Sequence, residues 1–341
     1  MGYVKKYPDW NGWPRNRAAV IAEIGINHGG DENLAWEMIR SAHKNGADFV
    51  KLQSFVMEDF LHPSIEYFSG MKLLELSLDR QKSLFGKAAE DGIRLITTPF
   101  DFASVDMAEE FDPPAHKIAS MDNDNIPLIR YVAEKGRPLL LSCGMADIAD
   151  IEKAVSVIRD TGNDKLVLLQ CVSDYPTKPE HLNLSMIGLL RETFGCPVGL
   201  SDHSVGITGS QIALSLGAVV IEKHFTTDRG LAKKIPNADH SISIEPPELK
   251  TLSEFCRSVK VMMGDAPRRL TETETAGRDK FKRGIYAKRN IKAGETLNLG
   301  NSSFLRPVKG IRAGQWDLVD GRKVTRDIQK NSPIVSSDIE E

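Results

Sequence analysis

Residues 219–228, VVIEKHFTTD, begin as a short apolar run and then change into charged and hydroxyl-bearing residues. The first three residues are β-branched, which favours a strand that is buried on both faces. Glu222 and His224 are two positions apart, so in a strand their side chains point to the same side. The stretch GLSDHSVG, residues 199–206, repeats this pattern around His203. The two stretches therefore predict strands whose histidines lie at the same edge of one sheet.

Similar apolar runs occur upstream and alternate with amphipathic, helix-like segments such as DENLAWEMIRSAHKNGAD (31–48). Eight runs of this kind are AVIAEIG (19–25), DFVKLQSF (48–55), IRLITTPF (93–100), AHKIAS (115–120), PLLLSCG (138–144), LVLLQCV (166–172), PVGLSDH (197–203) and VVIEKHF (219–225). The alternation predicts parallel pairing, because each return of the chain needs a crossover helix. We therefore predict an α/β fold with a closed (β/α)8 TIM barrel. A doubly wound open sheet is the alternative, but its G-x-G-x-x-G phosphate-binding pattern does not follow the first run.

The character of the chain changes after the last predicted barrel helix. The stretch GDAPRRLTETETAGRDKFKRG, residues 264–284, is polar and poor in aliphatic residues, as in a linker. Beyond it, short runs separated by Gly, Asn and Pro predict a small β-rich domain. The predicted organisation is an N-terminal extension (1–18), a catalytic barrel (19–263), a linker (264–282) and a small β-rich domain (283–341).

The composition is that of an ordinary globular protein, with 341 residues of which 41% are hydrophobic and 27% charged. Lysine and arginine number 44 against 47 acidic residues, so there is no general basic field for nucleic acid. The sequence has neither an apolar stretch near the roughly 20 residues that span a bilayer nor the apolar core of a signal peptide. We expect a cytoplasmic protein without membrane or nucleic-acid partners. The four cysteines form no C-x-x-C pair, which favours reduced core thiols.

Two lysines lie inside predicted strands, Lys51 in FVKLQ and Lys117 in HKIAS. An unpaired ammonium group in a barrel interior would lose its hydration at high cost. Either a neighbouring carboxylate such as Glu23 or a phosphorylated or carboxylated substrate should therefore face them. Hydroxyl groups lie at the same predicted strand ends, where TIM barrels build their active sites, and together with the lysines they predict an anion pocket. The hydroxyl residues are Thr98, Ser120, Ser142, Ser173 and Ser201.

The two histidines have two interpretations. Neutral imidazole is a common ligand of divalent transition metals, and two ligands from adjacent strand ends leave positions open for water and substrate. Alternatively, each histidine hydrogen-bonds a carboxylate at the barrel end. Glu222, on the same strand face as His224, is then either a partner of the metal site or an acid/base group.

Several motifs occur in a fixed order from about Ala19 to the end of the chain. They are AEIGINHGGD, VKLQSF, TTPFD, KIAS, LSCGM, SDYP, GLSDHSVG and IEKHFTTD, followed by IYAKRNIKAGETL and LRPVKGI. Together they resemble the N-acetylneuraminate (sialic acid) synthase family, which includes legionaminic and pseudaminic acid synthases. The resemblance implies a phosphoenolpyruvate-using (β/α)8 barrel followed by an antifreeze-like SAF domain of the β-clip type.

The resemblance also implies an aldol-like condensation of phosphoenolpyruvate with an N-acylated amino sugar, either N-acetylmannosamine or a 2,4-diacylamino-6-deoxyhexose. The product is a nine-carbon 2-keto-3-deoxy acid, and phosphate leaves with C–O cleavage. His203 and His224 would hold a divalent ion, typically Mn2+ with Mg2+ or Co2+ as alternatives, that polarises the aldehyde. A domain-swapped homodimer is implied as well, in which Arg306 of one subunit enters the barrel of the other.

The same resemblance assigns roles to the remaining site residues. Acid/base and water-activating roles are assigned to Glu23, Asp122 and Glu222. Contacts to phosphoenolpyruvate are assigned to Lys51, Thr98, Lys117, Ser120, Ser142, Ser173 and Ser201. Contacts to the sugar are assigned to Asn27, Gln53, Tyr175, Asp239 and Arg306.

The chain departs from the family pattern at a few positions. Asp122 stands where many members have glutamate, which shortens the carboxylate side chain by one methylene, and Gly29 replaces a frequent asparagine. The segment FTTDRGLAKKIPNA, residues 225–238, is longer than usual and carries Lys233 and Lys234. This segment is either a solvated loop or a contact for a sugar with an acidic or bulkier substituent.

Two other functions remain open from the sequence. A synthase for a different or phosphorylated aldose is disfavoured by the SAF-like tail and by the lack of an obvious extra arginine pair for a sugar phosphate. A non-catalytic carbohydrate-binding protein is disfavoured because both histidines and both lysines are retained.

Overall fold

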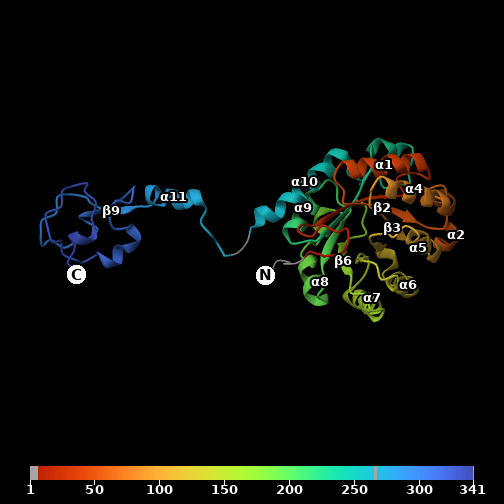
Figure 1. Ribbon diagram of the computed structural model, residues 1–341, viewed down its shortest axis with the longest axis horizontal. Helices are drawn as coiled ribbons and strands as arrows, with labels where there is room; N and C mark the ends of the chain where they lie inside the picture. Colours follow the sequence, from red (N-terminus) through yellow and green to blue (C-terminus); the bar gives the residue numbers. More distant parts are fainter. Residues whose placement is uncertain (1–6, 265–266, 341) are drawn as a thin grey trace. The chain divides into compact units, whose positions relative to one another are not determined.

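The structure is a computed structural model that describes residues 7–264 and 267–340. The chain forms two compact units, Met1–Gly264 and Asp265–Glu341 (Figure 1). Each has its own hydrophobic core. Residues 1–6, 265–266 and 341, which belong to the predicted extension, linker and small domain, lie outside the described ranges.

The first unit contains a closed barrel of eight parallel strands in sequential order (Figure 1). The strands are β1 (Ala19–Gly25), β2 (Phe49–Ser54), β3 (Leu95–Pro99), β4 (His116–Ile118), β5 (Leu139–Ser142), β6 (Leu166–Cys171), β7 (Val198–Asp202) and β8 (Val220–His224). Each strand lies inside the run predicted for it, and the prediction of a TIM barrel is confirmed. β8 pairs with both β7 and β1, which closes the barrel.

Helices cover the outside of the barrel and return the chain from each strand to the next (Figure 1). They are α1 (Glu32–Lys44), α2 (Met57–Phe60), α3 (Phe68–Lys72), α4 (Leu78–Glu90), α5 (Phe102–Glu109), α6 (Ile126–Glu134), α7 (Ile148–Asp160), α8 (Met186–Phe194), α9 (Thr208–Ser215) and α10 (Pro246–Met263). Aspartates cap three of them: the carboxylates of Asp31, Asp101 and Asp147 accept backbone N–H groups in the first turns of α1, α5 and α7.

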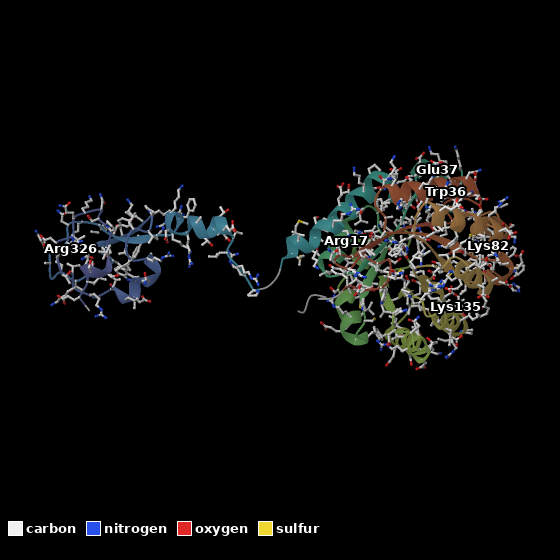
Figure 2. The ribbon with its side chains drawn as sticks, in the orientation of Figure 1. Arg17, Trp36, Glu37, Lys82, Lys135 and Arg326 are labelled. Carbon is white, nitrogen blue, oxygen red and sulfur yellow. The ribbon has the colours of Figure 1, made fainter. Side chains whose placement is uncertain are left out.

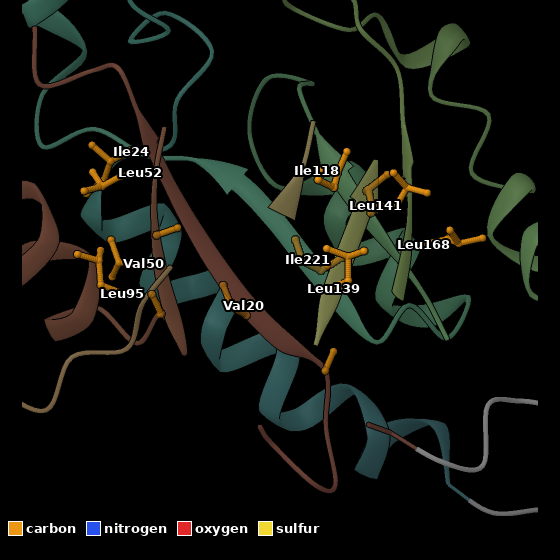
Figure 3. Packing of buried hydrophobic residues seen from close by; sticks show 14 of the residues in the cluster. Val20, Ile24, Val50, Leu52, Leu95, Ile118, Leu139, Leu141, Leu168 and Ile221 are labelled. Carbon is orange, nitrogen blue, oxygen red and sulfur yellow. The ribbon is translucent and has the colours of Figure 1, made fainter. Parts of the chain in front are cut away.

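Side chains along each strand alternate between two environments. In β1, Val20 and Ile24 point into the apolar layer between strands and helices, together with Val50 of β2 (Figure 3). Ile21 belongs to a second apolar cluster, inside the barrel, and Glu23 faces the cavity at its carboxyl end. The alternation thus places one set of side chains in the apolar helix layer. The inward-facing set is apolar deep in the barrel, as at Ile21, and polar at the carboxyl end, as at Glu23.

The amino-terminal end of the barrel is filled by apolar side chains. Trp13, from the segment before β1, packs on Phe49 with ring centroids 4.8 Å apart. Its indole N–H donates to the carbonyl oxygen of Pro114 at 3.3 Å. Because Ile21 and Val167 fill the same end, the polar interior residues lie toward the carboxyl ends of the strands.

Charged side chains lie on the outer surface of the first unit (Figure 2). Lys82 of α4 pairs with Glu110 at 2.7 Å, and Lys135, just after α6, pairs with Asp106 at 2.8 Å. Such exposed pairs contribute little to stability but keep the surface hydrated. Within the described ranges, no helix combines the length and apolar character needed to cross a membrane.

The second unit is small and its sheet is short. β9 (Gly284–Ala287) and β10 (Ser302–Leu305) form an antiparallel pair. Ile285, Val324 and Ile334 are buried in the core of this unit. The core is therefore built by segments distant in sequence, which agrees with a β-rich domain that has few regular strands.

The stretch predicted as a linker contains a ten-residue helix, α11 (Glu272–Phe281). Thr271 caps it by accepting the backbone N–H of Glu274 at 3.1 Å. This helix buries none of its residues. A helix that packs against no core needs no apolar stripe. Its sequence therefore lacks the apolar periodicity by which the other helices were predicted.

Candidate active site

A cavity of about 290 Å³ opens at the carboxyl end of the barrel, where TIM barrels place their active sites. All eight strands contribute to its wall with their last residues or with the loops that follow. The lining includes the sequence-predicted residues Glu23, Lys51, Gln53, Thr98, Lys117, Ser120, Ser142, Ser173, Tyr175, Ser201, His203, Glu222 and His224. The closed barrel thus gathers residues from the whole length of its sequence around one small volume.

Lys51 and Lys117 face this cavity and are almost completely buried. Lys51 forms an ion pair with Glu23 and donates to Thr98 Oγ1 at 2.7 Å. Both ammonium groups also approach Glu222, at 3.7 Å from Lys51 and 3.3 Å from Lys117. The carboxylate neighbour expected for Lys51 is therefore present. Both cations still border the cavity, where one anion can contact the two of them.

The two carboxylates differ in their affinity for a proton. Burial would raise the pKa of Glu222, but Lys117 and Lys51 more than offset it and lower that pKa to about 2. Burial raises the pKa of Glu23 to about 7, because the attraction of Lys51 offsets it only in part and the negative charge of Glu222 adds to it. Near neutral pH, Glu222 is a carboxylate, whereas Glu23 can hold or release a proton.

Three serines supply hydroxyl groups beside the lysines. Ser142 Oγ and Ser173 Oγ are buried and have no hydrogen-bond partner in the described part of the chain. Such groups are rare in native proteins, so they indicate a site for ligand oxygen atoms. The Gly144 N–H donates to Ser120 Oγ at 3.1 Å, and a Cβ at Gly144 would lie 2.6 Å from both Ser120 Oγ and Ser173 Oγ. Only glycine lets this loop approach the serines so closely.

His203 and His224 lie side by side, with ring centroids 5.3 Å apart. His203 Nδ1 lies 2.9 Å from the carbonyl oxygen of Val172. A neutral ring that donates from Nδ1 keeps the lone pair of Nε2 for another partner. Burial lowers the pKa of His224 well below the usual histidine range, and a proton on His203 would lower it further. Tyr175 stacks on His203, with centroids 4.1 Å apart.

These features fit a divalent ion held by two imidazoles. Bonds from such ions to histidine nitrogen are about 2.1 Å long, so two rings at this separation can share one ion. His224 Nδ1 is buried without a hydrogen-bond partner among the described residues and lies 3.6 Å from Asp239 Oδ2. Across residues 7–264 and 267–340, no group of three or more His, Cys, Asp or Glu side chains is suited to hold a metal. An ion here would take its remaining ligands from water and substrate.

Comparison with known proteins supports one family. The model of the NeuB family matches residues 38–268, and the model of the SAF domain matches residues 282–340. The chain belongs to the NeuB family. It is 34% identical over 334 residues to an N,N'-diacetyllegionaminic acid synthase of Campylobacter jejuni subsp. jejuni serotype O:2, covering 93% of this chain and 99% of the relative. It is 32% identical over 334 residues to a pseudaminic acid synthase of Campylobacter jejuni subsp. jejuni serotype O:23/36, covering 94% and 96%.

A solved structure of the NeuB relatives has the same architecture. The crystal structure of N-acetylneuraminic acid (sialic acid) synthetase from Leptospira borgpetersenii serovar Hardjo-bovis, in complex with citrate, superposes with a TM-score of 0.72 at 35% identity. The superposition covers 77% of this chain and 90% of that one. The resemblance found in the motifs and the barrel found in the structure therefore agree.

Two predicted residues of this NeuB barrel lie outside the described cavity lining. Asn27 is buried, and its amide donates to the Phe225 carbonyl and to Ser243 Oγ, both at 2.9 Å. It thus joins the loops that follow β1 and β8. Asp122 accepts from Asn125 Nδ2 at 3.0 Å, and burial raises its pKa. Their proposed contacts with sugar and water stay predictions.

Two further predicted sugar contacts lie apart from the cavity wall. Asp239 is half-buried, and its Oδ2 lies 3.6 Å from His224 Nδ1. It is not among the described lining residues. Arg306 belongs to the second unit, where it is exposed and forms no ion pair with any described residue. The entry of this arginine into the barrel of a partner NeuB subunit stays a prediction.

An apolar part of the cavity wall was not predicted from the sequence. Phe100, Met121 and Met145 line it, and the two methionines are 55% and 68% exposed, so a ligand can cover them. The four cysteines are free and buried, as expected, but Cys171 lines the cavity and lies 3.9 Å from His203 Nδ1. The two-residue alternation along β6 could have placed Cys171 on the inner face.

The long segment 225–238 is anchored on the loop after β1. Ile235 packs into an apolar cluster above the barrel and contacts the backbone at Gly29, where a Cβ would lie 2.8 Å from Ile235 Cδ1. Gly29 has a φ of +59°, which favours glycine as well. Lys233 and Lys234 are exposed. The two lysines are therefore solvated, and their contact with a sugar substituent stays a prediction.

A larger groove, of about 630 Å³, lies at the opposite end of the barrel. It is formed by residues 9–12 and by the loops that precede β3 to β6. Its Arg137 is already paired with Glu109 at 3.2 Å and with Asp112. Conserved chemistry of TIM barrels is found at the other end, so the NeuB site is assigned to the smaller cavity.

Proposed function

We propose that this protein condenses phosphoenolpyruvate with the aldehyde of an N-acylated amino sugar, giving a nine-carbon 2-keto-3-deoxy acid and phosphate. N-acetylmannosamine and 2,4-diacylamino-6-deoxyhexoses are the candidate acceptors. Family membership supports the reaction class, because the relatives named above are synthases of acids of this kind.

One observation carries the proposal. Two buried ammonium groups, from Lys51 and Lys117, and two unpartnered hydroxyls, from Ser142 and Ser173, border the same cavity as His203 and His224. The lysines and serines suit a small organic phosphate, and the histidines suit an electrophile. Phosphoenolpyruvate would take its phosphate and carboxylate contacts from these groups and from Thr98, Ser120 and Ser201.

His203 and His224 would hold a divalent ion, with Mn2+ as the expected metal. When bound, such an ion supplies Lewis-acid polarisation of a carbonyl group. The protein's own contribution is to orient the acceptor. Tyr175, stacked on His203, and Gln53 line the cavity at this side and offer a hydroxyl and an amide to the sugar.

In the proposed reaction, carbon 3 of the enol attacks the aldehyde carbon, water adds at carbon 2, and the C–O bond to phosphate breaks. The attacking water loses two protons as it becomes the keto oxygen at carbon 2. One proton is taken up by the sugar oxygen, and the other leaves with the phosphate. Glu23 is suited to move one of these protons, because its pKa lies near 7. Glu222 stays ionised between the two lysines, and its negative charge stabilises the positive charge that develops at carbon 2.

We further propose a homodimer in which Arg306 of one subunit contributes to the sugar site of the other, and a cytoplasmic location. The SAF match over residues 282–340 supports the presence of the module that carries Arg306. An exposed arginine without an acidic partner among described residues is available for such a contact.

Phosphate release tests the proposed function. The protein would be incubated with phosphoenolpyruvate, Mn2+ and a panel of N-acylated amino sugars and phosphorylated aldoses, and the product mass would identify the acceptor. We expect release with at least one N-acylated amino sugar, and none with His224→Ala under the same conditions. Phosphate release only with phosphorylated aldoses would contradict the proposal. A lack of release with every sugar in the panel would contradict it as well.

A further inference from the structure

A fully buried ion pair lies directly behind the two histidines. Asp202 of β7 and Lys223 of β8 occupy paired positions in the parallel ladder. Lys223 Nζ lies 3.2 Å from Asp202 Oδ2, and neither side chain has any exposed surface. His203 follows the end of β7 directly, His224 is the last residue of β8, and both line the cavity. Because side chains alternate along a strand, the ion pair lies on the helix side of the barrel wall.

Asp202 organises the turn that follows His203. Its Oδ1 accepts from the Ser204 backbone N–H at 2.9 Å and from Ser204 Oγ at 2.6 Å. Its Oδ2 accepts from Ser210 Oγ, in the first turn of α9, at 2.6 Å. Both oxygens of the Asp202 carboxylate thus accept hydrogen bonds. They hold the backbone in place on the carboxyl side of His203.

Lys223 extends this network to the second histidine. Besides its pairing with Asp202, its ammonium group donates to the Ser204 carbonyl oxygen. Ser204 follows His203, and Lys223 precedes His224. The two bonds of Lys223 therefore connect the residue before His224 to the residues on both sides of His203.

Stability alone does not explain why this position carries charges. Taking two charges out of water costs several kcal/mol per ion, and an apolar pair of similar volume is often as stable or more stable. An apolar pair would fill the space between β7, β8 and α9, but it could not bond the Ser204 backbone. The charged pair thus provides directional bonds to the turn beside His203, which packing cannot supply.

We propose that Asp202 and Lys223 are positioning residues that fix the separation of His203 and His224 and thereby set the metal affinity of the site. This inference rests on the proposed function, because it takes the two histidines as metal ligands. Neither residue lines the described cavity, so neither is expected to touch substrate.

Binding of Mn2+ to the full-length protein tests the inference without reference to catalysis. Free Mn2+ would be measured by electron paramagnetic resonance during titration of the wild type, Lys223→Met and the double variant Asp202→Val/Lys223→Met. We expect the dissociation constant to rise at least tenfold in both variants. The double variant should recover most of the melting temperature that the single variant loses, because no unpaired buried charge remains.

Ile158→Ala is the matched control for lost stability. Ile158 is fully buried on α7, which follows β5 and does not adjoin β7 or β8. The Ile158→Ala variant should lower the melting temperature about as much as Lys223→Met does. Its Mn2+ dissociation constant should stay within twofold of that of the wild type. A double variant that regains wild-type Mn2+ affinity along with its stability would overturn the positioning role. A wild type that binds no Mn2+ would overturn the metal part of the proposed function and the positioning role with it.

Discussion

At the scale of single residues, the site is a small volume in which buried charges of opposite sign balance one another. Lys51 and Lys117 are matched by Glu23 and Glu222. The proposed phosphorylated substrate would add negative charge, which the lysines and hydroxyls would have to balance as well. A proton on Glu23, which its raised pKa permits near neutral pH, reduces the repulsion that this substrate would feel.

The hydroxyl of Ser142 is expected to bind an oxygen of phosphoenolpyruvate, because it is buried without a partner among the described residues. Ser142→Ala removes one hydrogen bond to a charged group, so the KM for phosphoenolpyruvate should rise by about ten- to a hundredfold. Steady-state kinetics at saturating sugar would measure it. The control is Ser258→Ala on α10, where the serine is exposed. An unchanged KM in Ser142→Ala would argue against this contact.

His28 should make stability depend on pH. Burial lowers its pKa to about 4, its Nδ1 accepts the Gly30 N–H at 3.0 Å, and Nε2 has no partner within the described ranges. The unfolded chain, with an ordinary histidine pKa of about 6.5, takes up a proton that the folded protein does not. The free energy of unfolding should therefore fall as pH drops from about 6.5 to 4, by about 3 kcal/mol for this one group.

Urea unfolding of the wild type and His28→Asn at several pH values measures this dependence. Asparagine can still accept the Gly30 N–H but does not titrate, so the variant should lose less stability between pH 6.5 and 4. Above pH 7.5 the difference between the two proteins should be constant, which serves as the internal control. If the free energies of unfolding of the two proteins differ by the same amount at every pH down to 4, His28 is excluded as the titrating group.

At the scale of secondary-structure elements, the alternation of each strand determines which residues enter the site, and the following loops determine how closely they approach. β2 and β4 bring Lys51 and Lys117 to the inner face. The loop between β5 and α7 then passes close to Ser120 and Ser173 because residue 144 is glycine. A loop that carried a side chain there would displace the hydroxyls.

Gly144→Ala should weaken phosphoenolpyruvate binding. The new Cβ would lie 2.6 Å from Ser120 Oγ and Ser173 Oγ, so one or both hydroxyls must move away. We expect the KM for phosphoenolpyruvate to rise by about tenfold, the effect of one lost hydrogen bond. Gly188→Ala in α8 is the control, because a Cβ there meets no described atom within 4 Å. Equal kinetics in the two variants would show that the loop tolerates a side chain.

At the scale of the whole molecule, the protein combines a barrel that holds the reactive groups with a separate small unit that carries Arg306. The named synthases align with more than nine-tenths of the chain, so they share both parts. The proposed homodimer with exchanged units would give the small unit a role at the barrel of the partner subunit.

Mixing two defective variants tests the exchange. Arg306→Ala should raise the KM for the sugar by about tenfold or more and leave that for phosphoenolpyruvate unchanged, since one charged hydrogen bond is lost. His224→Ala should be inactive. After the two are unfolded and refolded together, half of the dimers are mixed, and at low sugar concentration about a quarter of the wild-type activity should return in a two-fold symmetric dimer.

The matched control for Arg306→Ala is Lys309→Ala, which removes an exposed cation from the same loop. This variant should have wild-type kinetics. Sedimentation velocity would establish the oligomeric state of each sample. A mixture that shows only the average activity of its two components would indicate that each barrel uses its own arginine or none.

Much of the barrel was predictable because its signals are local. Eight β-rich runs alternate with amphipathic helices, and each of the eight barrel strands lies inside its predicted run. The inward positions of Lys51, Lys117, Glu222 and His224 follow from the two-residue period of a strand. Helix α11 was missed because it is polar on all sides and so has no apolar period to detect.

The sequence by itself determined the order of the elements, the inner face of each strand and the family, because these depend on neighbouring residues and on motifs read along the chain. Tertiary structure alone decided which residues meet. The pairing of Asp202 with Lys223, the place of Cys171 in the cavity wall and the contact of Gly29 with Ile235 depend on barrel closure and loop packing. Opposite shifts in the pKa values of Glu23 and Glu222 also need that geometry, since burial and distance to the two lysines determine them.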